Sequence, residues 1–321
     1  REALRQAMQE EMRRDDTVLL MGEEVAEYNG AYKVSQGMLD EFGPDRVIDT
    51  PIAELGFGGI AVGASANGLR PIVEFMTFNF SLVAIDQVIN SAAKLMSMSG
   101  GQYSCPIVFR GPTGNAGQLS SQHSSNFENW FANTPGLKVV VPSNPADAKG
   151  LMKSAIRDND PVIFMESEVM YGDKGLVPEG EYLIPIGKAS VVKEGKDVTI
   201  VTFGKMLSRV VMPAVEELEK QGFSVEVIDL RTVRPIDYAT VVESVKKTNR
   251  CVVVEEANPL AAISSEITYH LQRWAFDYLD APVVRVNSRD LPLPYAPTLI
   301  DEILPSVERT IAAVKTVTYR K

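Results

Sequence analysis

The stretch from Asp49 to Leu69 decides the fold and reads DTPIAELGFGGIAVGASANGL. Thr50 followed by Pro51 predicts a helix start, because a hydroxyl can cap the helix and a proline at its first position gives up no needed N–H group. Each glycine that follows lowers helix stability by about 1 kcal/mol relative to alanine, so neighbouring backbone must pack closely against the helix. With no polar face, this helix is expected to be buried over most of its surface.

Glu54 is the only ionisable side chain between Asp49 and Arg70. An unpaired buried carboxylate is costly, so this side chain must be paired, neutralised or reserved for a ligand. Two interpretations stay open from the stretch alone. Glu54 could face water in the first turn and interact with the helix dipole, or it could be a functional buried acid, since perturbed acids concentrate at sites.

Helices and strands alternate on both sides of this stretch. Around the organising helix, apolar periodicity and turn residues predict helices and strands at 2–14, 17–25, 38–50, 70–80, 81–97, 105–111, 137–143, 144–160 and 161–167. The alternation resumes with strands at 197–204, 225–230, 251–256 and 282–286, and helices at 206–222, 237–248, 263–274 and from Thr298 onward. This order predicts the α/β class with two open, mostly parallel sheets.

Gly and Pro concentrate in residues 172–187, which marks a boundary between domains. We therefore expect one α/β domain over residues 1–185 and a second, smaller one over residues 186–321.

The composition is typical of an ordinary soluble globular protein, with 45% hydrophobic and 23% charged residues. A net charge of -10 without a Lys/Arg cluster argues against a nucleic-acid partner. No apolar run reaches membrane-spanning length, so no membrane association is expected. Cys105 and Cys251 lie far apart in apolar runs, and we interpret them as reduced core residues of an intracellular protein.

Polar residues follow several of the expected strands. Ligands of open parallel sheets bind beyond the carboxyl ends of the strands. One such ligand site could therefore bring together Glu23, Glu24, Glu54 and the polar loop 112–131. His123 is the one histidine in that loop. It could be a solvated loop residue, or an acid/base or substrate-orienting group.

Other candidates favour structural roles. We expect His270 to lie on a helix surface or in packing. Phe75, Phe78 and Phe80 indicate core packing, although one aromatic could flank a cofactor ring. The sequence contains no dinucleotide fingerprint in a strand–loop context, no P-loop and no nucleophile elbow.

Longer motifs resemble a known family. The run 49–94 (DTPIAELGFGGIAVGASANGLRPIVEFMTFNFSLVAIDQVINSAAK), together with CPIVFRGPTG (105–114) and SSQHS (120–124), resembles the beta subunits of 2-oxo acid dehydrogenase first components, which depend on thiamine diphosphate. The resemblance extends essentially end to end, through PGLKVVVPSNPADAKGLMKSAIRD, FMESEVMYG, LRTVRPID and LPLPYAP. EFMTFNF and AIDQVINSAAK are more similar to the pyruvate branch than to the branched-chain branch.

The resemblance implies a transketolase-like pyrimidine-binding domain followed by a transketolase C-terminal domain. The implied activity is decarboxylation of pyruvate with reductive acetylation of a lipoyl domain. A branched-chain 2-oxo acid or acetoin dehydrogenase beta subunit is the alternative within the family. A catalytically silent scaffold that anchors the acyltransferase core is the alternative outside enzymes.

The resemblance also assigns site residues. Glu54 matches the glutamate that meets N1′ of the cofactor's aminopyrimidine, and Ile52 and Phe80 match positions that line the pyrimidine pocket. A carboxyl group in apolar surroundings can share a proton with a ring nitrogen. His123 matches a histidine near the reacting centre and is expected to position the substrate and the acetyl transfer to the lipoyl group.

The family further implies a structural potassium site made of backbone oxygens, which by position are those of Ile107, Ala155, Ile156, Asp158 and Asp160.

The implied assembly contains a second kind of chain. The GDG-to-asparagine motif that holds Mg²⁺ and diphosphate in this superfamily is not found in the sequence. We therefore expect an alpha subunit to supply that half of the thiamine diphosphate site, in an α2β2 heterotetramer. The other implied partners are pyruvate and the dihydrolipoyl acetyltransferase core with its lipoyl domain. The expected compartment is the bacterial cytoplasm or, in a eukaryote, the mitochondrial matrix.

Overall fold

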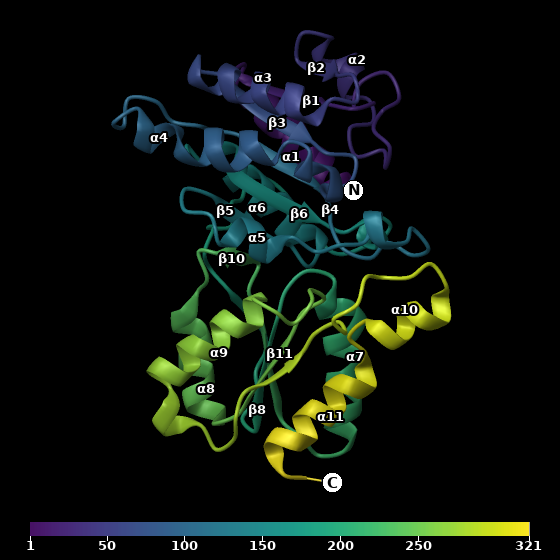
Figure 1. Ribbon diagram of the computed structural model, residues 1–321, viewed down its shortest axis with the longest axis vertical. Helices are drawn as coiled ribbons and strands as arrows, with labels where there is room; N and C mark the ends of the chain where they lie inside the picture. Colours follow the sequence, from purple (N-terminus) through teal and green to yellow (C-terminus); the bar gives the residue numbers. More distant parts are fainter. Residues whose placement is uncertain (321) are drawn as a thin grey trace.

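Two twisted sheets, each covered by helices on both faces, form the computed structural model, which describes residues 1–320 (Figure 1). The first sheet has the strand order β10-β5-β6-β4-β3-β1-β2, and the second has the order β12-β11-β8-β9-β7. Neighbouring strands are parallel except for the pairs β10–β5 and β7–β9. The expectation of two mostly parallel sheets is confirmed.

The first sheet is built almost entirely from the first half of the chain. Its strands are β1 (Val18–Gly22), β2 (Val47–Asp49), β3 (Arg70–Glu74), β4 (Val108–Pro112), β5 (Lys138–Val140), β6 (Val162–Glu166) and β10 (Thr232–Arg234). β10 comes from the second half and pairs with β5 at the sheet edge. The two halves of the chain therefore share one sheet.

Strand alternation divides the first core into two layers. Val18 and Leu20 face helices α1 (Glu2–Arg14) and α6 (Pro145–Arg157). Leu19 and Met21 face the opposite layer, which contains α3 (Glu54–Ala66), the π-helical turn η2 (Gln87–Ser91) and α5 (Glu128–Ala132). The short helix α2 (Met38–Phe42) precedes β2.

The second sheet is covered in the same way. Its strands are β7 (Ser190–Lys193), β8 (Val198–Thr202), β9 (Val225–Asp229), β11 (Cys251–Val254) and β12 (Val284–Val286). Helices α8 (Tyr238–Thr248) and α9 (Ile263–Trp274) pack on one face, and α7 (Met212–Lys220) and α11 (Val307–Thr318) pack on the other. The apolar cluster under α8 and α9 is continuous with the one under α3, so the halves share a core as well as a sheet.

Short helical turns complete the described chain, namely η1 (Phe78–Leu82), η3 (Ala92–Lys94), α4 (Leu95–Met98), η4 (Ser121–His123), η5 (Glu168–Met170), η6 (Leu207–Val211), η7 (Phe276–Tyr278) and α10 (Pro297–Ile303). The helix expected over 81–97 is wrong as a continuous element, because 3-10, π and α turns follow one another there. The helix expected from Thr298 is interrupted at Pro305. Leu304, which precedes the proline, is extended, and Ser306 caps the following helix.

The organising helix begins three residues later than the prediction. β2 ends at Asp49, whose carboxylate accepts hydrogen bonds from the Ala26 and Glu27 N–H groups at 2.7 and 3.0 Å. The Thr50 N–H donates to the Gly22 carbonyl oxygen at 2.9 Å. These bonds hold the chain along the sheet edge, so α3 begins at Glu54 and Thr50 does not cap it.

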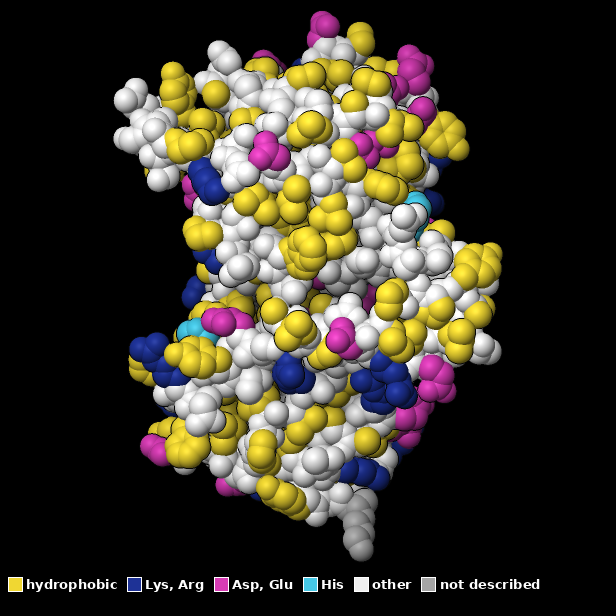
Figure 2. All heavy atoms as spheres, in the orientation of Figure 1, with side chains coloured by type: hydrophobic (Ala, Val, Ile, Leu, Met, Phe, Trp, Pro, Cys, Tyr) yellow, Lys and Arg dark blue, Asp and Glu magenta, His cyan; other side chains and the backbone are white. Residues whose placement is uncertain are grey.

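The expectation that α3 is buried over most of its surface is wrong for this chain alone. A Cβ at Gly58 would lie 3.4 Å from Ala84, which confirms close packing on the inner face. The outer face is open, with Leu55 49% and Ile60 64% exposed. Figure 2 shows apolar side chains spread over the face that this helix presents. Such a face is typical of an interface with another chain.

Arg110 is the largest fully buried side chain and lies on central strand β4. Its guanidinium binds the Glu166 carboxylate through two bonds of 2.7 and 2.6 Å, and it also binds Glu74. The Tyr171 hydroxyl donates to Glu166 at 2.7 Å. Because Glu74 and Glu166 end strands β3 and β6, this cluster ties the ends of those two strands to the middle of β4.

We expect Arg110→Met to lower the free energy of unfolding by on the order of 3–5 kcal/mol, because it leaves two buried carboxylates without their partner. Arg13→Met is the control, since its pair with Glu41 is largely exposed and its loss should change stability by less than about 1 kcal/mol. Urea unfolding of both variants measures the difference. Equal effects of the two substitutions would contradict the role assigned to the cluster.

Candidate functional site

The carboxyl ends of the first sheet's parallel strands point the same way and together form one boundary of the sheet, which we call its carboxyl edge. The register aligns Gly22 with both Asp49 and Glu74, and aligns Pro112 with Glu166. The segments that follow β1, β2, β3 and β4 therefore leave the sheet at the same edge, where ligands of open parallel sheets bind.

Glu54 and Glu23 form a buried carboxyl pair at this edge. Glu23 follows β1, Glu54 begins α3, and their exposed fractions are 7% and 6%. Burial, the charge of Glu54 and a hydrogen bond with Glu54 raise the pKa of Glu23 from its ordinary value of 4.5 to about 7. Glu23 therefore keeps its proton up to about neutral pH. The side chain of Glu54 is buried, so the interpretation of Glu54 as a water-facing residue is wrong. Glu24 is exposed and does not take part.

Phe80 and His123 form a second group. Phe80 lies in η1 after β3, His123 lies in η4 after β4, and their rings meet edge to face with centroids 5.2 Å apart. Both side chains are half-buried. Phe75 and Phe78 are core residues, as the packing interpretation predicted.

Ile52 lies two residues before Glu54 on the segment that leads into α3, and it is 82% exposed. The structure thus places the predicted residues at one sheet edge, with Glu23 beside Glu54 and the ring of Phe80 against His123.

The five residues of the expected potassium site come from neighbouring segments of the first half. Arg70 Nη1 donates to the carbonyl oxygens of Ile156 and Asp158 at 3.1 and 3.0 Å. The Ile107 oxygen accepts from Val162 N at 2.8 Å, and the Ala155 oxygen accepts from Asp158 N at 3.2 Å. The side chains of Asp158 and Asp160 pair with Lys138.

The Arg70 guanidinium thus already occupies two of the five oxygens, although a carbonyl oxygen has a second lone pair that can accept another partner. Residues 1–320 contain no group of three or more His, Cys, Asp or Glu side chains arranged to hold a metal ion. A cation at this place would therefore depend on main-chain oxygens.

Two charged features were missed by the sequence reasoning. Glu128, at the start of α5, is fully buried, and burial raises its pKa to about 7. Lys205 and Glu256, both buried, form an ion pair of 2.6 Å between the segments after β8 and β11. Charged residues directly after apolar strands were the available signal, but their partners are distant in sequence.

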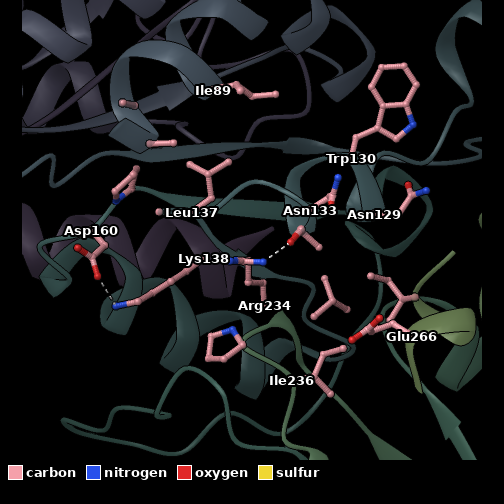
Figure 3. A pocket seen from close by; sticks show the side chains of 18 of the residues that line it. Ile89, Asn129, Trp130, Asn133, Leu137, Lys138, Asp160, Arg234, Ile236 and Glu266 are labelled. Atoms are coloured by element: carbon pink, nitrogen blue, oxygen red, sulfur yellow. Dashed lines mark hydrogen bonds and ion pairs between the residues drawn. The ribbon is translucent and has the colours of Figure 1, made fainter. Parts of the chain in front are cut away.

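A cavity of about 1640 Å³ lies away from both groups, between α5 and β5 on one side and β10 and α9 on the other (Figure 3). Ile89 and Leu137 line one wall and Ile236 lines the other. Glu54 and His123 are absent from its lining. The cavity is therefore separate from the candidate site.

The remaining sequence expectations on side chains agree with the structure. His270 stacks on Tyr238 with ring centroids 3.6 Å apart and pairs with Glu266 at 3.1 Å on the α9 surface, which confirms its structural role. Cys105 and Cys251 are buried free thiols. No helix within residues 1–320 has both the length and the hydropathy needed to cross a bilayer.

Comparison with known proteins connects this architecture with two families. The family described as "Transketolase, pyrimidine binding domain" matches residues 1–174, and "Transketolase, C-terminal domain" matches residues 187–310. A solved "Split gene transketolase, inactive beta4 tetramer" has a TM-score of 0.82 over 100% of this chain and 98% of that chain, at 23% identity. That likeness concerns the fold.

Curated relatives align over nearly the whole chain. "Pyruvate dehydrogenase E1 component subunit beta" of Rhizobium meliloti is 56% identical over 100% of this chain and 70% of its own length. The protein of the same name from Rickettsia felis is 56% identical over 99% and 98%. The mitochondrial "subunit beta-2" of Oryza sativa is 53% identical over 100% and 86%.

The raised pKa of Glu23 predicts that the stability of the fold depends on pH. Because the folded state raises the pKa of Glu23, its stabilising effect is complete below about pH 4.5 and is lost as the pH rises through about 7. We expect Glu23→Gln to reduce the fall in thermal midpoint between pH 5.5 and pH 8. Glu24→Gln, at the exposed neighbouring position, should retain the fall seen in the unchanged chain. Identical pH profiles for both variants would contradict the raised pKa of Glu23.

Proposed function

Since this chain belongs to the family of pyruvate dehydrogenase E1 component beta subunits, we propose that its carboxyl sheet edge holds the pyrimidine half of thiamine diphosphate, with Glu54 as the acid that meets the ring. The single observation that carries this proposal is the buried Glu23–Glu54 pair, in which the pKa of Glu23 is raised to about 7. A carboxyl group in that state can exchange a proton with a ring nitrogen at little energetic cost.

The surroundings of the pair fit a flat heterocycle. Ile52 and Leu55 flank Glu54 with exposed apolar side chains, and Phe80 offers an aromatic ring at the same sheet edge. Thr50 Oγ1, four residues before Glu54, is buried without a hydrogen-bond partner. Apolar walls with a few polar groups are the usual composition of a cofactor site.

Each of the site residues has a distinct role in the proposed function. When bound, thiamine diphosphate supplies an electron sink for decarboxylation of a 2-oxo acid. Glu54 holds and moves the proton at the pyrimidine nitrogen, while Glu23 keeps the Glu54 carboxyl oriented by a hydrogen bond. Ile52 and Phe80 pack against the ring and exclude water. His123, held against Phe80, positions pyruvate and then the lipoyl group that receives the acetyl unit.

The proposed assembly is an α2β2 heterotetramer. The open outer face of α3, with Leu55 and Ile60 exposed, supports docking of another chain beside Glu54. We assign to the alpha subunit the Mg²⁺ and diphosphate half of the site. The second half of this chain is proposed to contact the dihydrolipoyl acetyltransferase core and to present the site to its lipoyl domain.

Pyruvate is the proposed substrate, because the relatives above carry the name pyruvate dehydrogenase. The proposed compartment is the cytoplasm in a bacterium or the mitochondrial matrix in a eukaryote, and the mitochondrial name of the rice relative supports the latter. Faster turnover of 3-methyl-2-oxobutanoate or acetoin than of pyruvate by the reconstituted complex would favour the alternative branches of the family.

A structural K⁺ is proposed at the carbonyl oxygens of Ile107, Ala155, Ile156, Asp158 and Asp160. Backbone bonds hold the oxygens of Ile107 and Ala155 in place, and the proposal requires the cation to share the oxygens of Ile156 and Asp158 with Arg70. There the cation would order the loop between α6 and β6 without touching the substrate.

We expect KCl to raise the thermal midpoint of the complex by a few degrees over choline chloride at the same ionic strength. Only a specifically bound cation stabilises the folded state in this way. A LiCl series controls for general salt effects, because a smaller cation fits carbonyl oxygens spaced for K⁺ less well. Equal midpoints in all three salts would contradict the site.

We expect Glu54→Gln to lower the rate of pyruvate decarboxylation by the reconstituted α2β2 complex by about 10²–10⁴-fold, because the amide cannot transfer the proton. Glu24→Gln is the matched control and should retain the rate. The measurement is thiamine-diphosphate-dependent release of carbon dioxide at saturating pyruvate. An unchanged rate in the Glu54 variant would instead favour the silent-scaffold alternative.

A further inference from the structure

The loop that carries His123 is closed at its base. It leaves β4 at Thr113 and returns at Ser125, where Gly114 N donates to the Ser125 carbonyl oxygen at 3.1 Å. The Thr113 hydroxyl donates to the same oxygen at 3.4 Å. Figure 1 shows the segment between β4 and α5 at the junction of the two halves. The position of His123 therefore depends on how this base is held.

Both main-chain groups of Asn115 are bound by side chains from the second half. Its N–H donates to Glu256 Oε1 at 2.5 Å, and its carbonyl oxygen accepts from Lys205 Nζ. Lys205 and Glu256 are themselves paired at 2.6 Å, with side-chain exposures of 8% and 4%. We refer to Lys205 and Glu256 together as the loop clamp.

The close approach of the clamp requires glycine beside it. Gly114 has a φ of +74°, and a Cβ there would lie 2.8 Å from Glu256 Oε1 and 2.9 Å from Asn126 Nδ2. The space behind the clamp has a volume of about 20 Å³, enough for about one water molecule. Asn115 therefore has little freedom to shift while the ion pair is intact.

A buried ion pair is weak evidence for a stabilising role, because the free-energy cost of removing its two charges from water is about as large as their electrostatic attraction. The geometry points to another use. We propose that Lys205 and Glu256 are positioning residues, which hold the His123 loop against Phe80 for transfer of the acetyl group to the lipoyl domain. This inference rests on the role of His123 in the proposed function, and adds to it two residues from the other half of the chain.

The test uses the reconstituted α2β2 complex and measures acetylation of a free lipoyl domain. We expect Lys205→Met, which removes the terminal ammonium but keeps an unbranched side chain as far as Cε, to slow acetylation by about 10- to 100-fold, because a displacement of about 1 Å can cost that much. Lys205→Arg keeps the cation and its donors and should restore most of the rate. His123→Ala measures the loss when the loop residue itself is absent.

The double variant shows whether the clamp acts through His123. If it does, Lys205→Met combined with His123→Ala should be no slower than His123→Ala alone, within about twofold. Effects that multiply would overturn the proposal, because they would mean that Lys205 acts by an independent route.

Arg231→Met is the matched control. Arg231 also joins the second half to the first through an ion pair with buried Asp147, at 2.8 Å, but it makes no hydrogen bond to the His123 loop. We expect this variant to lower the thermal midpoint as Lys205→Met does, while acetylation stays within about twofold of the unchanged complex. Equal losses of acetylation in Lys205→Met and Arg231→Met would mean that any contact between the two halves has this effect, and would overturn the proposal.

Hydrogen exchange separates this inference from the proposed function. Amides of residues 115–124 should exchange at least about tenfold faster in Lys205→Met, and unchanged in Arg231→Met, since exchange reports local opening. A complex with no activity on pyruvate would overturn the proposed function, while the exchange result would still decide whether the clamp holds the loop. Unchanged exchange in Lys205→Met would overturn the clamp even in a fully active complex.

Discussion

The buried guanidinium of Arg110 is the constraint on which the first half of the chain depends. A charge in the middle of a parallel sheet is tolerated only when its partners satisfy it fully, and Glu74 and Glu166 do so from the neighbouring strands. Since these two residues are the last of β3 and β6, the cluster fixes the ends of those two strands against the middle of β4. The loops that carry Phe80 and His123 begin within a few residues of that cluster.

Glu23 and Glu54 form a second buried group of charged residues in the first half of the chain. Burial beside a second carboxyl group disfavours the charged form of an acid, and the pKa of Glu23 is raised accordingly. The pair lies beside the open apolar face of α3, where Leu55 and Ile60 remain exposed. A proton-holding acid and an uncovered apolar surface at one place are the features expected of a site that a second chain completes.

The second half of the chain is packed into the structure of the first half. It contributes β10 to the first sheet, a continuous apolar core and the Lys205–Glu256 pair that binds Asn115. The boundary expected near residue 185 follows from the concentration of Gly and Pro, yet these contacts cross it. The two halves are therefore joined by hydrogen bonds at the loop that bears His123.

The sequence by itself determined the α/β class, most elements of the two sheets and the suspicion attached to Glu54, because these depend on local periodicity and on a single charge within an apolar run. It also indicated that His123 follows a strand end. Only the tertiary structure decided that Glu23 lies buried against Glu54, that β10 joins the first sheet, and that Lys205 and Glu256 bind Asn115. Each of those is a pairing between residues distant along the chain, whose partners no local pattern specifies. The open face of α3 was missed for the same reason, since an apolar helix buried within one chain and one that awaits a second chain have the same sequence pattern.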